Sequence, residues 1–130
     1  MKICIFDDDH QTLMLTKLLL EKAGHDVIAT DQAGQAVGIS VNNLPDAVIT
    51  DRMMPGMDGM RLIGRLRARR ELKDLVIILM SLDSRDGNRW QREALSAGAD
   101  AFIGKPFDPE KFSQDVEDIV ARRHEQPTVD

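Results

Sequence analysis

Short apolar runs alternate with longer, helix-patterned segments along the whole chain, and this alternation limits the folds open to it more than any other feature. The runs are rich in Ile, Val and Leu, which is typical of strands buried on both faces of a parallel sheet. Parallel neighbours need a crossover connection, and the segments between the runs can each supply a helix. The expected strands are residues 2–6, 26–30, 47–50, 76–80 and 101–103.

The helix signals between these runs differ in strength. The clearest lies near the C-terminal end, where Asp108 is expected to be an N-cap and Pro109 the first helical residue. The weakest lies over 31–43, where Gly34 and Gly38 lower helix propensity. Helical spacing and end signals predict three further helices: one ending at Gly24, one capped by Asp58, and one that contains Trp90 and ends at Gly98.

Five strands and five helices in alternation predict an α/β domain with right-handed crossovers. In such sheets, ligands bind at the carboxyl ends of the strands. Polar side chains occur there after four of the five expected strands, and none follows the second, which is expected at the margin of the sheet. They are Asp7, Asp8 and Asp9 after the first strand, Asp51 after the third, Ser81 after the fourth and Lys105 after the fifth.

Three of these residues, Asp7, Asp8 and Asp51, would place carboxylates side by side. Two like charges 4 Å apart repel by roughly 4 kcal/mol at an effective dielectric constant of 20. A cation would relieve this repulsion, and an all-oxygen site with few protein ligands suits Mg²⁺. The alternative is that Asp8 or Asp9 only caps the following helix.

Asp51 ends a buried run and precedes a loop containing Pro55, and a carboxylate there is a competent nucleophile toward phosphorus. Phosphoryl transfer depends mainly on charge neutralisation, which Mg²⁺, Lys105 and the Ser81 hydroxyl could provide. Lys105 precedes Pro106 and is therefore held extended. We expect this peptide bond to be cis and to direct Lys105 inward.

Composition narrows the class of function. The net charge is −5 and the pI about 5.1, which argues against direct nucleic-acid binding. No apolar run approaches the roughly 18 residues of a membrane span, and the chain opens on a strand-like segment instead of a signal peptide. With a single cysteine, Cys4, no internal disulfide can form. We expect a cytoplasmic domain without membrane contact.

Taken together, four motifs resemble the receiver domains of bacterial two-component response regulators, from Met1 to about Arg122. Residues 123–130 are expected to be a polar tail or linker, which fits either a stand-alone protein or a domain of a longer chain. The motifs are IFDDD with Asp7 and Asp8, ITDRMMPGMDG with Asp51, ILMS with Ser81 and FIGKPF with Lys105.

This resemblance implies a flavodoxin-like three-layer sandwich with a five-stranded parallel sheet of order 2-1-3-4-5 and five helices. It also implies a role for each motif residue. Asp51 is the expected phosphorylation site; Asp8, Asp51 and the Met53 carbonyl are expected Mg²⁺ ligands, with Asp7 acting partly through water; Lys105 is the cationic partner of the phosphate, Ser81 the switch hydroxyl and Phe102 the switch aromatic.

Receiver domains take their phosphoryl group from a phosphohistidine on a sensor kinase or a phosphotransfer protein, and they catalyse only their own phosphorylation and dephosphorylation. The resemblance therefore implies a switch whose added charge alters a partner-binding surface, here about residues 86–122. The reader of that surface would be an effector protein, a fused output domain or a second copy of the chain.

Two positions depart from the family pattern. Leu82 stands where relatives carry Ala or Gly, so we expect restricted access for acetyl phosphate and water, and a long-lived aspartyl phosphate. Phe102 lacks the phenolic hydroxyl common at its position, so packing alone would hold its inward state.

Two other functions stay open. An aspartyl-phosphate phosphohydrolase of the haloacid-dehalogenase kind would carry an acidic residue where this chain has Met53, and would need a cap over its substrate. A receiver-type interaction module would never be phosphorylated on Asp51. Among the remaining features, the arginines of 61–70 are expected to be a solvated helix face or a kinase-docking surface, and Trp90 a core residue or a partner anchor.

Overall fold

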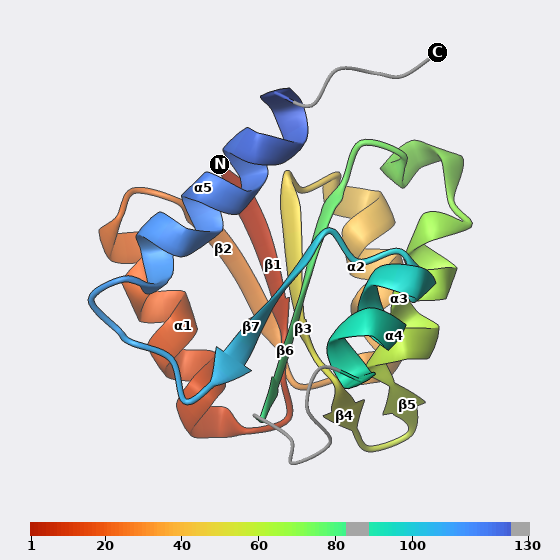
Figure 1. Ribbon diagram of the computed structural model, residues 1–130, viewed down its shortest axis with the longest axis horizontal. Helices are drawn as coiled ribbons and strands as arrows, with labels where there is room; N and C mark the ends of the chain where they lie inside the picture. The colour runs from red at the N-terminus through yellow and green to blue at the C-terminus, as the bar shows by residue number, and fades with distance from the viewer. Residues whose placement is uncertain (83–88, 126–130) are drawn as a thin grey trace.

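A computed structural model describes residues 1–82 and 89–125. Its main sheet contains β1 (Lys2–Phe6), β2 (Asp26–Thr30), β3 (Ala47–Asp51), β6 (Val76–Leu82) and β7 (Ala101–Lys105). All neighbours pair in parallel in the order β2-β1-β3-β6-β7, so the expected order 2-1-3-4-5 is confirmed and β2 lies at one edge (Figure 1).

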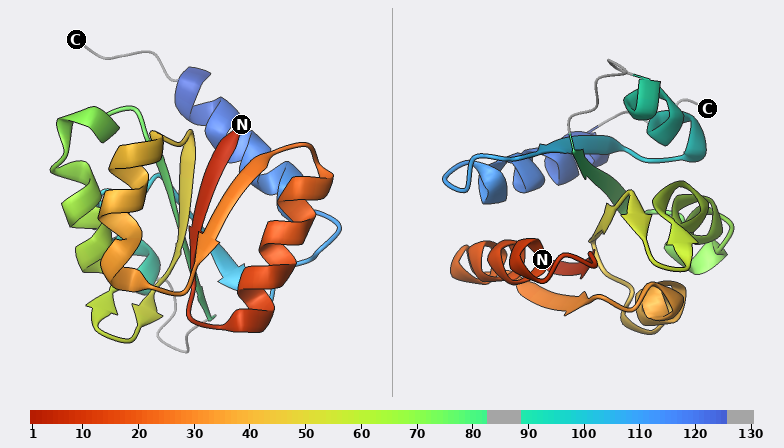
Figure 2. Two further views of the ribbon diagram at one scale, coloured as in Figure 1. Left: turned by 180° about the vertical axis from the view of Figure 1, so that it is seen from behind. Right: turned by 90° about the horizontal axis from the view of Figure 1, so that it is seen from below.

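Helices cover both faces of this sheet, which gives the expected three layers (Figure 2). On one face, α1 (His10–Lys22) and α5 (Phe112–Glu125) pack against Ile3, Ile5, Ile49 and Ile78. On the other, α2 (Ala36–Asn43), α3 (Gly59–Arg67) and α4 (Arg89–Ala97) cover a second cluster with Phe6, Leu79 and Trp90. Because successive strand residues face opposite sides, both clusters come from the same strands.

The start of the last helix differs from the prediction. The Asp108 carboxylate accepts a hydrogen bond from the Glu110 N–H at 2.9 Å, but it caps the turn that leads into α5 and not the helix itself. The Asp115 N–H donates to the Lys111 carbonyl at 2.9 Å, so α5 begins at Phe112. The helix runs on to Glu125, through residues 123–125 of the expected tail. Residues 126–130 lie outside the described part of the chain, as do residues 86–88 of the expected partner-binding surface.

The strands that end at the candidate site extend further than their apolar runs, and reach Asp51, Leu82 and Lys105. Main-chain hydrogen bonds do not depend on side-chain polarity, so the ladder continues past the last apolar residue. A two-stranded antiparallel hairpin, β4 (Met53–Met54) with β5 (Met57–Asp58), forms in the segment expected to be a loop. The weak helix signal over 31–43 corresponds to a short 3₁₀ turn, Ala33–Gln35, followed by α2.

One arginine of the expected solvated face is in fact structural. Arg67 lies at the end of α3 and donates to the carbonyls of Gly98 at 2.8 Å and Leu75 at 2.7 Å. It also pairs with the Asp100 carboxylate at 2.6 Å, and the same Asp100 oxygen accepts the Ile77 N–H. Arg67 therefore joins α3 to the starts of β6 and β7, at the N-terminal ends of these strands, and the candidate site lies at their C-terminal ends.

Within the described residues, no helix has both the length and the apolar character needed to span a bilayer. Trp90 is 1% exposed, so its role as a core residue is confirmed.

Replacing Gly59 with alanine is expected to disturb the hairpin that follows Asp51. A Cβ atom at this position would lie 2.5 Å from the Asp51 carbonyl oxygen and 2.9 Å from the Arg52 Cα, both backbone atoms. Overpacking of this kind costs about 1–3 kcal/mol. Urea unfolding should show that loss for Gly59→Ala, whereas Gly64→Ala on the open side of α3 should be neutral or stabilising.

Candidate functional site

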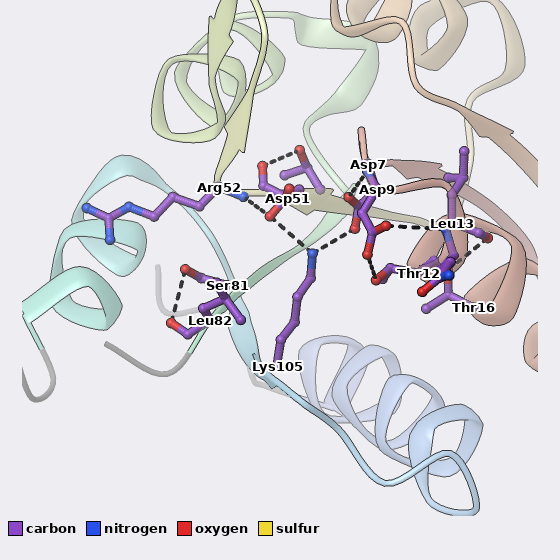
Figure 3. Close-up of polar contacts among 12 residues, drawn as sticks. Asp7, Asp9, Thr12, Leu13, Thr16, Asp51, Arg52, Ser81, Leu82 and Lys105 are labelled. Atoms are coloured by element: carbon purple, nitrogen blue, oxygen red, sulfur yellow. Dashed lines mark hydrogen bonds and ion pairs between the residues drawn. The ribbon is translucent and has the colours of Figure 1, made fainter. Parts of the chain in front are cut away.

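The pleat of the sheet brings the expected site residues of three strands onto one face. Each continues, two positions later, an isoleucine that packs between the sheet and α1 or α5. These pairs are Ile5 and Asp7, Ile49 and Asp51, and Ile103 and Lys105. The three polar side chains therefore converge at the carboxyl edge of the sheet, with the Lys105 ammonium between the two carboxylates (Figure 3).

Asp7 is the most buried acid of the site, at 2% exposure. Its Oδ1 accepts the Asp9 N–H at 2.9 Å, and its Oδ2 accepts Lys105 Nζ at 2.9 Å. Asp9 in turn caps α1, accepting the Gln11 N–H and the Thr12 hydroxyl. The acidic triplet is thus divided, with Asp9 in the capping role and Asp7 directed into the site.

Asp51 is half-buried and lies 3.3 Å from Lys105 Nζ, while its Oδ1 also accepts the Arg52 N–H at 2.9 Å. Burial, followed by the charge of Asp7, raises the pKa of Asp51 to about 6, although Lys105 opposes the rise. Burial disfavours the charged form of Lys105, but its hydrogen bond to Asp7 and the charges of both carboxylates outweigh this, so its pKa is raised. The site is therefore short of positive charge around Asp51.

This shortage predicts that Asp51→Asn stabilises the metal-free protein. The pKa of Asp51 in the folded chain, about 6, lies above its ordinary 3.8, so folding favours the protonated form. The contribution of this group to stability falls as the pH rises from 3.8 to about 6 and stays lost above that. Urea unfolding in chelator should show Asp51→Asn more stable than the wild type by about 1–3 kcal/mol above pH 6.

That advantage should shrink as the pH falls toward 3.8, because wild-type Asp51 becomes neutral as well. An advantage that does not change with pH would contradict the charge argument.

The three expected metal ligands do lie together. One carboxylate oxygen from each of Asp7, Asp8 and Asp51 lies within 4.8 Å of the others. Asp8 is exposed while Asp7 is buried, so the cluster opens to solvent on one side. Three carboxylate oxygens that surround a solvent-accessible position, in a site short of positive charge, fit a divalent cation such as Mg²⁺.

Ser81 and Leu82 end β6 on opposite faces. Ser81 continues the positions that face α3 and α4; its buried hydroxyl donates to the Leu82 carbonyl at 3.4 Å (Figure 3). Leu82 is paired in register with Lys105 and is 71% exposed. A large apolar residue thus lies beside the lysine at the end of β6.

Phe102 is partly buried on the same face as Ser81. Its ring meets Trp90 of α4 edge-on, with centroids 5.5 Å apart and planes at 73°. Met53 lies in β4 with its side chain exposed. The Lys105–Pro106 peptide bond is cis, as expected.

Two residues near the site make contacts that were not predicted from the sequence. The Arg52 side chain reaches α4, and the Gly59 backbone packs against Asp51. The charge of Arg52 does not indicate which acidic residue it pairs with. Glycine is common in turns, so Gly59 by itself does not indicate a close backbone contact with Asp51.

The match to known proteins agrees with this geometry. Residues 3–117 match the family described as the response regulator receiver domain. The chain therefore belongs to the receiver-domain family of two-component response regulators, which are phosphoacceptor signalling switches and not enzymes in the usual sense.

A chemotaxis protein CheY homolog of Campylobacter jejuni is 30% identical over 122 residues, which cover 92% of each chain. The phosphate regulon transcriptional regulatory protein PhoB of Pseudomonas aeruginosa is 30% identical over 120 residues. Those cover 92% of this chain and 52% of PhoB, so the chain spans about half of such relatives. A two-component response regulator from Clostridium difficile superposes with a TM-score of 0.83 at 25% identity, covering 96% of this chain and 98% of that one.

Proposed function

We propose that Asp51 accepts a phosphoryl group from a phosphohistidine donor. An Asp51 carboxylate oxygen attacks phosphorus, the P–N bond of the donor breaks, and an acyl phosphate forms. The observation that carries this proposal is the convergence of Asp7, Asp51 and Lys105, with Lys105 Nζ 2.9 Å and 3.3 Å from the two carboxylates.

The chain's own groups would act mainly by placing charge. The Lys105 ammonium would contact the phosphoryl oxygens and balance their charge. Its hydrogen bond to Asp7 would orient it toward them. Asp7, Asp8, Asp51 and the Met53 carbonyl would hold Mg²⁺. The ion, when bound, would neutralise charge on the phosphoryl oxygens. The same groups would orient a water molecule for slow self-dephosphorylation.

Ser81 and Phe102 would carry the change to the partner surface. A phosphoryl oxygen would draw the Ser81 hydroxyl from the Leu82 carbonyl, and Phe102 would turn into the space left. Turning of the Phe102 ring would change its edge-on contact with Trp90 of α4. The surface formed by α4, β7 and α5 would then differ for an effector, an output domain or a second copy. We infer a cytoplasmic location and no direct nucleic-acid contact by this domain. The domain would span residues 1–122 and continue to Glu125, where α5 ends.

Intact-mass spectrometry after incubation with a phosphohistidine donor and Mg²⁺ tests the proposal. One added phosphoryl group is expected, absent from Asp51→Asn and from a sample without Mg²⁺. Absence of the adduct in the wild type with every donor would favour an interaction module that is never phosphorylated, and repeated turnover of a phosphate ester would favour a phosphohydrolase.

Leu82→Ala is expected to speed phosphorylation by acetyl phosphate, and loss of the aspartyl phosphate, by several-fold. Leu82 is exposed beside Lys105. Its side chain would narrow the approach of small molecules to Asp51. Time courses of the phosphorylated mass measure both rates. Leu95→Ala, which removes another exposed leucine, is the matched control; equal rates in the wild type and Leu82→Ala would exclude this role.

A further inference from the structure

The arginine that directly follows the phosphoacceptor points away from it. The Arg52 N–H donates to Asp51 Oδ1 at 2.9 Å and to the Met80 carbonyl at 3.0 Å, which anchors its backbone at the end of β3. Its side chain extends to the opposite side, toward α4 (Figure 3). There, Arg52 Nη2 lies 3.8 Å from Glu93 Oε2. One ion pair thus bridges the residue beside Asp51 and a helix of the opposite layer.

Helix α4 has a second link to the sheet one turn away from Glu93. Trp90 packs in the core and meets Phe102 edge-on. Its indole N–H is buried and makes no hydrogen bond within the described residues. A buried donor without an acceptor is unfavourable, so, as far as the described residues go, the packing of α4 leaves this polar group unsatisfied. Helix α4 thus has an ion pair with Arg52 on its exposed side and an aromatic contact with Phe102 on its buried side.

We propose that Arg52 is a positioning residue that pairs with Glu93 only while Asp51 is unphosphorylated. This step rests on the proposed function, because it requires a phosphoryl group on Asp51. Phosphorylation adds a charge of about −1.5 to −2 and three acceptor oxygens. A guanidinium prefers such an anion to a single carboxylate, because it can donate two parallel hydrogen bonds to it.

The existing pair is well suited to such an exchange. Its separation of 3.8 Å is long, and the two side chains are 32% and 47% exposed, so solvent already weakens it. The Arg52 backbone is fixed by two hydrogen bonds, so the change of partner would be made by rotation of its side chain. Departure of the guanidinium takes one contact away from Glu93, and α4 shifts around Trp90. This route to α4 is separate from the one through Ser81 and Phe102.

The experiment uses Trp90 as its own reporter, since the chain has one tryptophan and no tyrosine. Emission spectra are recorded with and without beryllofluoride and Mg²⁺, as a stand-in for the phosphoryl group, for Arg52→Gln, Glu93→Gln, the double variant and Arg52→Lys. The control is Glu71→Gln, which breaks the exposed Arg69–Glu71 pair, 3.0 Å apart and distant from α4. Urea unfolding confirms that each variant is folded.

We expect Arg52→Gln and Glu93→Gln to shift the emission of the free protein toward that of the beryllofluoride-bound wild type. The double variant should shift no further than Glu93→Gln alone, because Arg52 acts through Glu93, and Arg52→Lys should stay near the wild type. Free variants with wild-type emission, or additive effects of the two substitutions, would overturn the proposal. A wild type that gains a phosphoryl group by mass while Trp90 does not respond would also overturn it, and leave the function of Asp51 intact.

Discussion

Lys105→Met is expected to lower the rate of phosphoryl transfer to Asp51 by about 100- to 1,000-fold, the range seen when one preorganised donor to a developing charge is removed. Lys105 is the cation that contacts both Asp7 and Asp51. Without it, the transferred group meets two carboxylates with nothing to balance their charge on that side. Time courses of the phosphorylated mass with a phosphohistidine donor measure this rate.

The same variant should bind Mg²⁺ more tightly than the wild type. A positive charge 3.3 Å from Asp51 repels a second cation, and its removal leaves the three carboxylates to the metal. Slower transfer together with tighter metal binding, measured by calorimetry, cannot come from a misfolded site. Lys73→Met, which removes an exposed lysine, should change neither quantity; weaker Mg²⁺ binding by Lys105→Met would contradict the charge argument.

Arg67→Met is expected to destabilise the fold by about 1–3 kcal/mol, the cost of leaving partly buried acceptors without their donor. The Asp100 carboxylate, 14% exposed, would lose its closest cation, and the carbonyls of Leu75 and Gly98 would lose a donor. A domain of this size is stable by only about 5–15 kcal/mol, so the loss should be plain in urea unfolding.

Arg65→Met is the matched control on the same helix. Arg65 is exposed, so its replacement should change stability by less than about 0.5 kcal/mol. Equal small losses in the two variants would show that Arg123, 3.5 Å from Asp100, can satisfy that carboxylate alone.

Much of the candidate site could be predicted because its geometry follows from strand periodicity. The alternate residues of three runs face α1 and α5, and the next position of that alternation is Asp7, Asp51 or Lys105. The two-residue period of a strand therefore predicts that these three side chains lie on the same face. Ser81 falls on the opposite face by the same rule, beside Phe102. These placements depend on local order along each strand and on the parallel pairing of neighbours.

Predictions failed where a local signal had two meanings. Asp108 does accept the N–H that a capping residue would accept, but the turn before α5 offers the same hydrogen bond as a helix, and α5 starts at Phe112. The arginines of 61–70 are alike in sequence, yet within the described part of the chain Arg67 is the one that donates to the carbonyls of two other segments.

The sequence by itself determined the alternation of strands and helices, the edge of the sheet where polar residues gather, and the acids, hydroxyl and lysine that gather there. These depend on periodicity and on neighbours along the chain. Only the tertiary structure decided the Arg67–Asp100 bridge, 33 residues apart, and the Arg52–Glu93 pair between two layers. A long cationic side chain can reach several acids, and the packing of whole elements selects the one that it meets.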